Sequence, residues 1–209
     1  MKFITNTSDL AKFLNKKIKF NALIKSISTD TRSLKKNSLF IAIKGENFDG
    51  NDFVDEALSK GSNIIIADNK RFKKNKNKRI IWVNDSIKAL KTISHNIIKD
   101  YGGNVIAITG SNGKTTTTNI IGKTLKNNSK TLKNFNNEIG MPLSLMDASS
   151  KSKNLIFEIG ASKLNDIDYL SKILQPNVGL ITNIGNSHLE SLKNICLLYT
   201  SPSPRDLST

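Results

Sequence analysis

Residues 105–118 read Val-Ile-Ala-Ile-Thr-Gly-Ser-Asn-Gly-Lys-Thr-Thr-Thr-Thr, which is an apolar run followed by a glycine-rich turn and four threonines. This order predicts a strand, a tight turn and a helix that continues through residues 119–125. The N–H groups of such a turn, together with the positive end of the helix dipole, cradle phosphate oxygens. Lys114 can reach the outer phosphates, and the Thr115 hydroxyl can hold Mg²⁺. The stretch therefore predicts a nucleoside triphosphate site.

The turn departs from the general phosphate-loop pattern G-x-x-x-x-G-K-[ST]. Only two residues separate Gly110 from Gly113, and Ile108 stands at the first glycine position. An ordinary turn between a strand and a helix is the alternative, but the Gly-Lys-Thr triplet and both flanking elements favour a nucleotide site. The predicted nucleotide-binding residues are Thr109, Gly110, Ser111, Asn112, Gly113, Lys114, Thr115 and Thr116.

The chain is strongly basic, with 32 lysines and arginines against 17 acidic residues and a formal charge of +15. Such a charge is typical of proteins that bind nucleic acid or membranes. Lysine greatly outnumbers arginine here, and asparagine and isoleucine are also abundant, which is the signature of an A/T-rich genome. The one dense basic run, residues 70–79, has no interleaved aromatic residue beyond Phe72 and is interpreted as a solvated loop. Nucleic-acid binding stays open as an alternative function.

Targeting and cysteine patterns add little to the functional assignment. No stretch approaches the roughly 18 apolar residues that span a bilayer, and the N-terminus lacks the features of a cleaved signal. We therefore expect a cytoplasmic protein. Cys196 is the only cysteine, so there is no disulfide framework and no cysteine metal site. From Cys196 onward the lysine and asparagine bias stops, and residues 196–209 resemble a translated sequencing adapter, with a natural Ser/Pro-rich terminus as the alternative.

The element pattern predicts an α/β protein with two units. A small N-terminal α/β unit, residues 1–83, is expected to contain a helix at 7–14, a strand at 38–43, a helix at 52–60, and strands at 63–67 and 79–83. The second unit, residues 84–195, begins with an amphipathic helix at 85–100. Its further predicted elements are strands at 104–109, 154–159 and 178–183 and helices at 115–126 and 163–174. This alternation favours a mostly parallel sheet with helices on both faces.

Two further side chains follow strands of the second unit, and ligands of parallel sheets bind beyond the carboxyl ends of the strands. Glu158 ends an apolar run, where a carboxylate is costly unless it is paired or bound to a metal. Mg²⁺ beside ATP phosphates is a suitable partner, and a solvated strand end is the alternative. His188 follows the strand at 178–183; a lone histidine is more often structural than a ligand. The turns at 29–32, 45–50 and 134–143 are plain loops by composition alone.

Taken together, the chain resembles the Mur ligases. The resemblance lies in TDTR at 29–32, LFIAIKGENFDGNDFVDEALSKGS at 39–62, TGSNGKTTT at 109–117, NNEIGMPLSL at 136–145, FEIGAS at 157–162 and QPNVGLITNIGNSHLESL at 175–192. Within the family, the blocks at 158–161 and 182–190 favour the branch that adds D-alanyl-D-alanine. Departures are Asn51, where the family often has His, and Ser162-Lys163, where this branch often has Asn-His.

The resemblance implies an ATP- and Mg²⁺-dependent ligase of peptidoglycan precursor synthesis. Such an enzyme phosphorylates the terminal carboxylate of UDP-N-acetylmuramoyl-tripeptide, and the amine of D-alanyl-D-alanine attacks the acyl phosphate. Catalytic roles fall to Lys114, Glu158 and His188, and metal-binding roles to Thr115, Glu158 and His188. Substrate-binding roles fall to Thr31, Arg32, Asp49, Gly50 and Asn137. Residues 1–83 become the UDP-substrate domain and residues 84–195 a partial ATP-binding central domain of a protein that is monomeric when full length.

Family members are much longer than this chain, so we expect a C-terminally truncated and inactive fragment. Two alternatives lie within related enzymes: a Mur ligase that adds a single amino acid, and a folylpolyglutamate synthetase, which leaves the first unit unexplained. A third, from another class, is a non-catalytic protein that binds nucleotides or nucleic acid.

Overall fold

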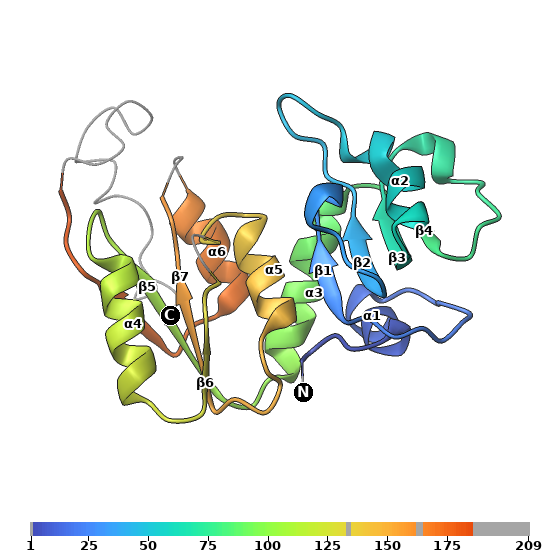
Figure 1. The fold of residues 1–209 in the computed structure, drawn as a ribbon. Helices are drawn as coiled ribbons and strands as arrows, with labels where there is room; N and C mark the ends of the chain where they lie inside the picture. The colour runs from blue at the N-terminus through green and yellow to red at the C-terminus, as the bar shows by residue number, and fades with distance from the viewer. Residues whose placement is uncertain (1, 133–134, 162–164, 186–209) are drawn as a thin grey trace. The chain divides into compact units, whose positions relative to one another are not determined.

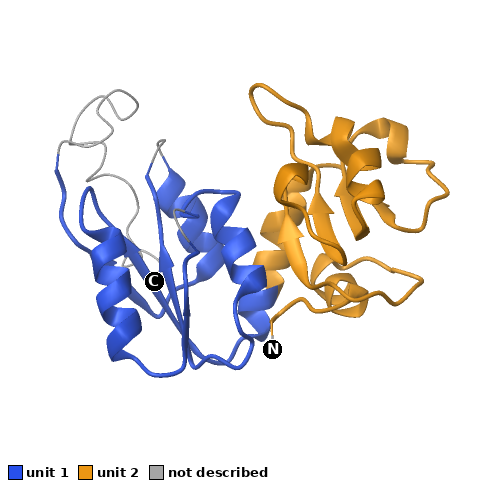
Figure 2. Cartoon of the chain, in the orientation of Figure 1, with its two compact units in different colours: residues 1, 97–209 blue, residues 2–96 orange. Residues whose placement is uncertain are grey.

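The computed structural model describes residues 2–132, 135–161 and 165–185. The chain forms two compact units, one of residues 2–96 and one from residue 97 onward (Figure 2). The boundary between these compact units lies inside helix α3 (Ser86–Asp100). The assignment of functional domains to residues 1–83, 84–195 and 196–209 stays a prediction, and the last of these ranges lies outside the described residues.

The first unit is built on a four-stranded sheet in the order β1-β2-β3-β4, with every pair parallel (Figure 1). The strands are β1 (Ser26–Ser28), β2 (Ser38–Ile41), β3 (Ser62–Ala67) and β4 (Ile80–Trp82). Both faces of the central strands β2 and β3 are buried, which explains their continuous apolar sequence. Phe40 and Ile65 on one face pack with Val54 and Ala57 of helix α2 (Val54–Ser59).

The helices of the first unit lie close to their predicted positions. Helix α1 (Thr7–Leu14) has the predicted bounds, and Asn6 caps it because its side chain accepts the N–H groups of Ser8 and Asp9. The predicted helix at 52–60 is a 3₁₀ turn, η2 (Gly50–Phe53), followed by α2. Gly61 follows α2 with a φ of 90°, the left-handed conformation that favours glycine after a helix.

The second unit also has an all-parallel sheet, in the order β6-β7-β5-β8, so the expected α/β architecture with parallel sheets is confirmed. Its strands are β5 (Asn104–Thr109), β6 (Asn128–Lys130), β7 (Asn154–Glu158) and β8 (Val178–Ile181). Ile106, Ile108 and Ile156 pack with Ile121 of helix α4 (Lys114–Thr124) on one face. Helix α6 (Asp166–Leu174) also packs on β5. β5 thus lies between β7 and β8 and sends its loop out at the carboxyl edge of the sheet.

Helix α5 (Gly140–Asp147) contradicts the expectation of a loop at 134–143. Every residue from Gly140 to Met146 is buried, so the helix lacks the polar face that would have given it a helical period. Pro142 is tolerated because it lies in the first turn, where N–H groups have no intrahelical partner. A Cβ on Gly140 would lie 2.6 Å from the Cα of Phe135, so only glycine lets the helix begin this close to the preceding segment.

Candidate nucleotide and metal site

Three strand ends of the second unit converge at the carboxyl edge of its sheet. Ile108 of β5 pairs with Glu158 of β7, and Thr109 pairs with Ile181 of β8. The glycine-rich loop after β5 and the Glu158 carboxyl group therefore occupy the same edge, as the sequence predicted. In parallel α/β sheets, ligands usually bind outside the carboxyl ends of the strands, at the point where the connections from two neighbouring strands run in opposite directions.

The glycine-rich loop turns directly into helix α4. Gly110 has a φ of 136° and Gly113 a φ of 81°, two conformations that residues with a Cβ rarely adopt. Gly113 is the residue before the helix, and no side chain caps α4. The first N–H groups of the helix, those of Lys114, Thr115 and Thr116, have no acceptor within the helix. This helix start can therefore bind an anion.

Lys114 folds back over the loop. Its Nζ donates to the carbonyl oxygen of Gly110 and, at 3.4 Å, to that of Ser111. The ammonium group is therefore held at the mouth of the loop, where incoming phosphate oxygens are stronger acceptors than carbonyl groups because they are charged. This position suits the predicted role of Lys114.

Glu158 is a buried carboxylate, only 3% exposed. Its Oε2 accepts the Thr115 hydroxyl at 3.1 Å, and its backbone N–H donates to the Thr131 hydroxyl at 2.7 Å. Among the described residues Glu158 forms no ion pair, and nowhere in that part of the chain do three or more His, Cys, Asp or Glu side chains gather. A buried carboxylate beside a hydroxyl, next to a phosphate-binding helix start, fits Mg²⁺, which accepts few protein oxygens and keeps phosphate and water ligands.

Residues 182–185, which we call the strap, follow β8 and contact the loop. The Asn183 carbonyl oxygen accepts the Ser111 N–H at 3.1 Å, and Asn183 Oδ1 accepts the Asn112 N–H at 2.8 Å. The Ser111 hydroxyl donates to the Gly185 carbonyl oxygen at 3.1 Å and accepts the Gly185 N–H at 2.9 Å. Sequence reasoning grouped the strap with a family block but gave its residues no role, because these contacts cross more than 70 positions of the chain.

The second unit contains two further predicted site residues, His188 and Asn137. His188 lies outside the described residues, so its metal-binding role stays a prediction. Asn137 precedes helix α5, and its Oδ1 accepts the N–H groups of Gly140 at 2.7 Å and Ile139 at 3.2 Å. The side-chain oxygen of Asn137 therefore already accepts two backbone hydrogen bonds, so a contact with substrate would use its amide nitrogen.

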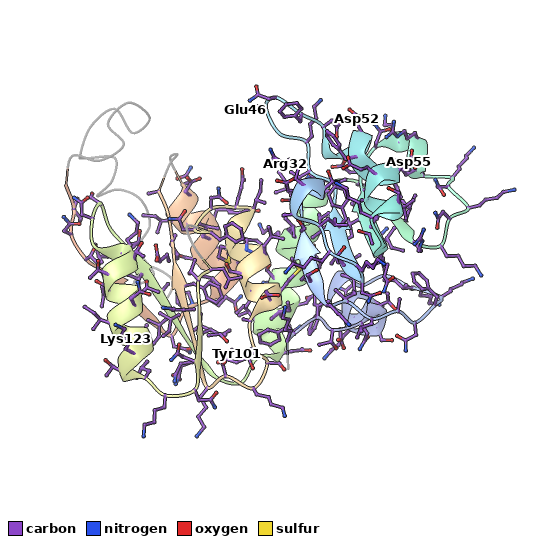
Figure 3. All side chains as sticks on the ribbon, viewed as in Figure 1. Arg32, Glu46, Asp52, Asp55, Tyr101 and Lys123 are labelled. Carbon is purple, nitrogen blue, oxygen red and sulfur yellow. The ribbon has the colours of Figure 1, made fainter. Side chains whose placement is uncertain are left out.

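In the first unit, the predicted residues Thr31 and Arg32 belong to the 3₁₀ turn η1 (Thr31–Ser33), which Asp30 caps. Asp30 holds the Arg32 side chain through a fork, with Nη2 at 2.7 Å from Oδ2 and Nε at 3.0 Å from Oδ1. Hydrogen bonding to Arg32 keeps the pKa of Asp30 below its ordinary value. The Arg32 side chain, labelled in Figure 3, is nevertheless 89% exposed. Arg32 is thus pre-oriented and open to an anionic ligand.

Thr31 is buried, with 6% of its surface exposed. Its carbonyl oxygen accepts Lys60 Nζ at 3.0 Å. Lys60 also holds the pKa of Glu56 below its ordinary value, and the Thr31 hydroxyl contributes to that shift. Thr31 therefore organises the turn that presents Arg32, and its contact with substrate stays a prediction.

Asp49 and Gly50 lie in a partly buried hydrogen-bond network. Asp49 Oδ1 accepts both the backbone N–H of Asn51, at 2.9 Å, and its Nδ2, at 2.7 Å. Asn51 Nδ2 also donates to Asp68 at 2.7 Å. A Cβ on Gly50 would lie 2.5 Å from the backbone nitrogen of Ile43, so only glycine fits there. Asn51, a departure from the family pattern, is thus a satisfied structural residue that fixes the loop carrying Asp49 and Gly50.

None of the helices within the described residues combines the length and apolar character needed to cross a membrane.

Comparisons with known proteins identify relatives of both units. A model described as Mur ligase family, catalytic domain, matches residues 23–98, and the Mur ligase middle domain matches residues 108–199. A UDP-N-acetylmuramoyl-tripeptide–D-alanyl-D-alanine ligase of Bacillus subtilis is 38% identical over 173 residues, covering 81% of this chain and 38% of that protein. The ligase of the same name from Buchnera aphidicola subsp. Baizongia pistaciae is 42% identical, covering 82% of this chain and 38% of that protein.

Solved structures agree with the sequence matches. The crystal structure of MurF ligase from Thermotoga maritima in complex with ADP superposes with a TM-score of 0.75 at 34% identity, covering 84% of this chain and 41% of that one. The present chain spans about two fifths of the length of the curated relatives that it matches.

Proposed function

Because the chain belongs to the Mur ligase family, we propose that it contains the substrate-binding unit and the nucleotide-binding edge of an ATP-dependent ligase. The proposed reaction joins D-alanyl-D-alanine to UDP-N-acetylmuramoyl-tripeptide through an acyl phosphate. One observation carries the ATP part of this proposal. The buried Glu158 carboxylate contacts the Thr115 hydroxyl at the start of the helix that follows the glycine-rich loop.

The residues at this edge have the chemistry that phosphoryl transfer requires, which is positioning and neutralisation of charge. The N–H groups at the start of α4 bind phosphate oxygens, and the Lys114 ammonium moves from the loop carbonyl groups to the outer phosphate. The substrate carboxylate then attacks the terminal phosphorus, the bond to the ADP oxygen breaks, and ADP leaves. The neutral amine of D-alanyl-D-alanine attacks the carbonyl carbon of the resulting acyl phosphate, the carbon–oxygen bond to the phosphate breaks, and the nitrogen loses a proton to solvent, which gives the amide and inorganic phosphate.

Mg²⁺ would be held by Thr115 and Glu158, with His188 proposed for a second ion. When bound, the metal supplies positive charge to the phosphate oxygens. Glu158 would supply the negatively charged protein ligand. The Thr131 hydroxyl accepts the Glu158 N–H and so fixes the end of the strand that carries this carboxylate.

The first unit is proposed to bind the uridine diphosphate end of the substrate. Arg32 is the exposed cation there, and Asp49 and Gly50 form a loop that the Asn51 network holds rigid. Monomeric state and cytoplasmic location stay predictions.

The family match weakens the alternatives. Both matched models are Mur ligase models, and one of them covers the first unit, which a folylpolyglutamate synthetase would leave unexplained. The curated relatives named above add D-alanyl-D-alanine, which favours that branch over the addition of a single amino acid. The lysine-rich charge needs no nucleic-acid partner in this account.

Substitution of Arg32 tests the assignment of the first unit. Arg32→Ala removes an exposed, pre-oriented guanidinium, and a charged hydrogen bond of this kind contributes about 1.5–3 kcal/mol. We expect the Kd of the 209-residue chain for UDP, measured by calorimetry, to rise roughly tenfold, while its Kd for MgADP stays unchanged. Lys76→Ala, which removes one exposed charge from the basic loop, is the control and should alter neither value. Equal weakening of UDP and MgADP binding, or no weakening of either, would contradict the assignment.

A further inference from the structure

We propose that Asn183 is a positioning residue that holds the shortened phosphate loop in its binding shape; this inference rests on the proposed binding of ATP. Asn183 contacts two consecutive N–H groups of the loop. Its carbonyl oxygen accepts the Ser111 N–H at 3.1 Å, and its Oδ1 accepts the Asn112 N–H at 2.8 Å. The side-chain bond is the one that depends on residue type, because any residue supplies the carbonyl oxygen.

The shortened loop needs this support. In the longer pattern, four residues between the glycines wrap around the phosphates with their own N–H groups. Here only Ser111 and Asn112 stand between the glycines, and both N–H groups point to Asn183. The phosphate-binding N–H groups are therefore those from Gly113 onward. The direction in which they point depends on the position of Ser111 and Asn112, which Asn183 holds.

The strap approaches the loop as closely as the backbone allows. A Cβ on Gly110 would lie 2.9 Å from the Asn183 carbonyl oxygen and 3.0 Å from its nitrogen. On either side, the Thr182 N–H donates to the Thr109 carbonyl oxygen at 2.9 Å, and the Ser111 hydroxyl exchanges hydrogen bonds with Gly185. Asn183 is thus anchored from both directions, so its carboxamide has a fixed position from which to hold the Asn112 N–H.

The expected cost of losing the carboxamide is local. Asn183 is exposed, so water can replace its contacts and global stability should change little. A typical hydrogen bond contributes a net 0.5–1.5 kcal/mol, and a loop that is no longer held must be ordered when the nucleotide binds. The affinity for nucleotide should therefore fall about threefold to tenfold.

Asn177 provides a matched control. Its Oδ1 accepts the Val105 N–H at 2.8 Å, which is the same kind of bond from another exposed asparagine, but at the opposite end of β8 and β5. Asn177→Ala therefore removes an equivalent bond from the same strand pair, far from the loop.

The test uses the ¹⁵N-labelled 209-residue chain with Asn183→Ala, Asn183→Asp and Asn177→Ala. Asn183→Ala should speed hydrogen exchange of the Asn112 amide about threefold to tenfold in the ligand-free protein and raise the Kd for MgADP by a similar factor. Asn183→Asp keeps an acceptor, so exchange at Asn112 should stay slow, while its added charge weakens MgADP binding in a way that salt relieves. Asn177→Ala should change neither quantity.

Several results would overturn the inference. It is wrong if Asn183→Ala binds MgADP as tightly as the unmutated chain, if Asn177→Ala weakens binding equally, or if Asn183→Asp exchanges at Asn112 as fast as the alanine variant. Failure of the unmutated chain to bind MgADP would contradict the proposed function itself and the inference with it. Exchange at Asn112 without ligand reports on the hydrogen bond independently of that outcome.

Discussion

Lys114→Ala is expected to raise the Kd of the chain for ATP roughly tenfold to a hundredfold. The ammonium group at the mouth of the loop exchanges two carbonyl acceptors for charged phosphate oxygens, and hydrogen bonds to charged groups contribute about 1.5–3 kcal/mol. In a full-length enzyme that carries the same loop, turnover should fall on the order of a hundredfold or more, because the lost charge is preorganised for the transition state.

Lys123→Ala is the matched control for Lys114→Ala. Lys123 lies in the last turn of the same helix, α4, and is labelled in Figure 3. Removing it changes the net charge equally but leaves the loop intact, so the Kd for ATP should be unchanged. Calorimetric titration of both variants decides the matter: if both lose affinity to the same degree, the effect of Lys114 is general electrostatics and its assigned role is wrong.

Glu158→Gln is expected to remove most of the Mg²⁺ dependence of ATP binding. Glutamine can still accept the Thr115 hydroxyl but carries no charge for the metal, so Mg²⁺ should strengthen ATP binding in the unmutated chain and only weakly in the variant. Raising Mg²⁺ should restore part of the loss, whereas it should not rescue Lys114→Ala. In metal-free buffer, the melting temperature of the variant should match or exceed that of the unmutated chain, because a buried carboxylate without a cation is costly.

The control for Glu158→Gln is Asp168→Asn. Asp168 forms an ion pair with Lys172 within α6, 2.8 Å apart, and has no role in the proposed site. Its substitution should leave the Mg²⁺ dependence of ATP binding as it is. Should Glu158→Gln lower the melting temperature strongly without metal while the Mg²⁺ dependence persists, Glu158 would be a structural residue.

Long apolar elements of this fold were predictable from the sequence. β5 has the predicted bounds because its polar flanks mark both ends of an apolar run, and α1 does because its ends carry polar cap residues. β1 and β6 were not predicted, because each is only three residues long and mostly polar. In β1 two of the three residues, Ser26 and Ser28, are polar, and in β6 all three are. Their pairing with β2 and β7 is a tertiary effect that local sequence does not encode.

The candidate site likewise contains residues that the sequence indicated and residues that it did not. The sequence pointed to the glycine-rich loop, Lys114, Thr115 and Glu158 as candidates, because each occupies a recognisable position relative to a strand. Asn183 was not assigned a role, because its partner Asn112 lies 71 positions earlier. The burial of Thr31 and the hydrogen bond from the Gly140 N–H to Asn137 also escaped prediction, since a motif specifies residue types but not the direction in which their side chains point.

The most direct test of the account is an NMR titration of the ¹⁵N-labelled chain with MgADP. In the proposed site, the phosphates lie at the start of α4, beside Glu158. The largest shifts should therefore fall on the amides of residues 113–116 and of Glu158, Mg²⁺ should increase them, and Lys114→Ala should strongly reduce them. Shifts centred elsewhere, or none at saturating MgADP, would contradict the claim that this edge of the second unit is a nucleotide site.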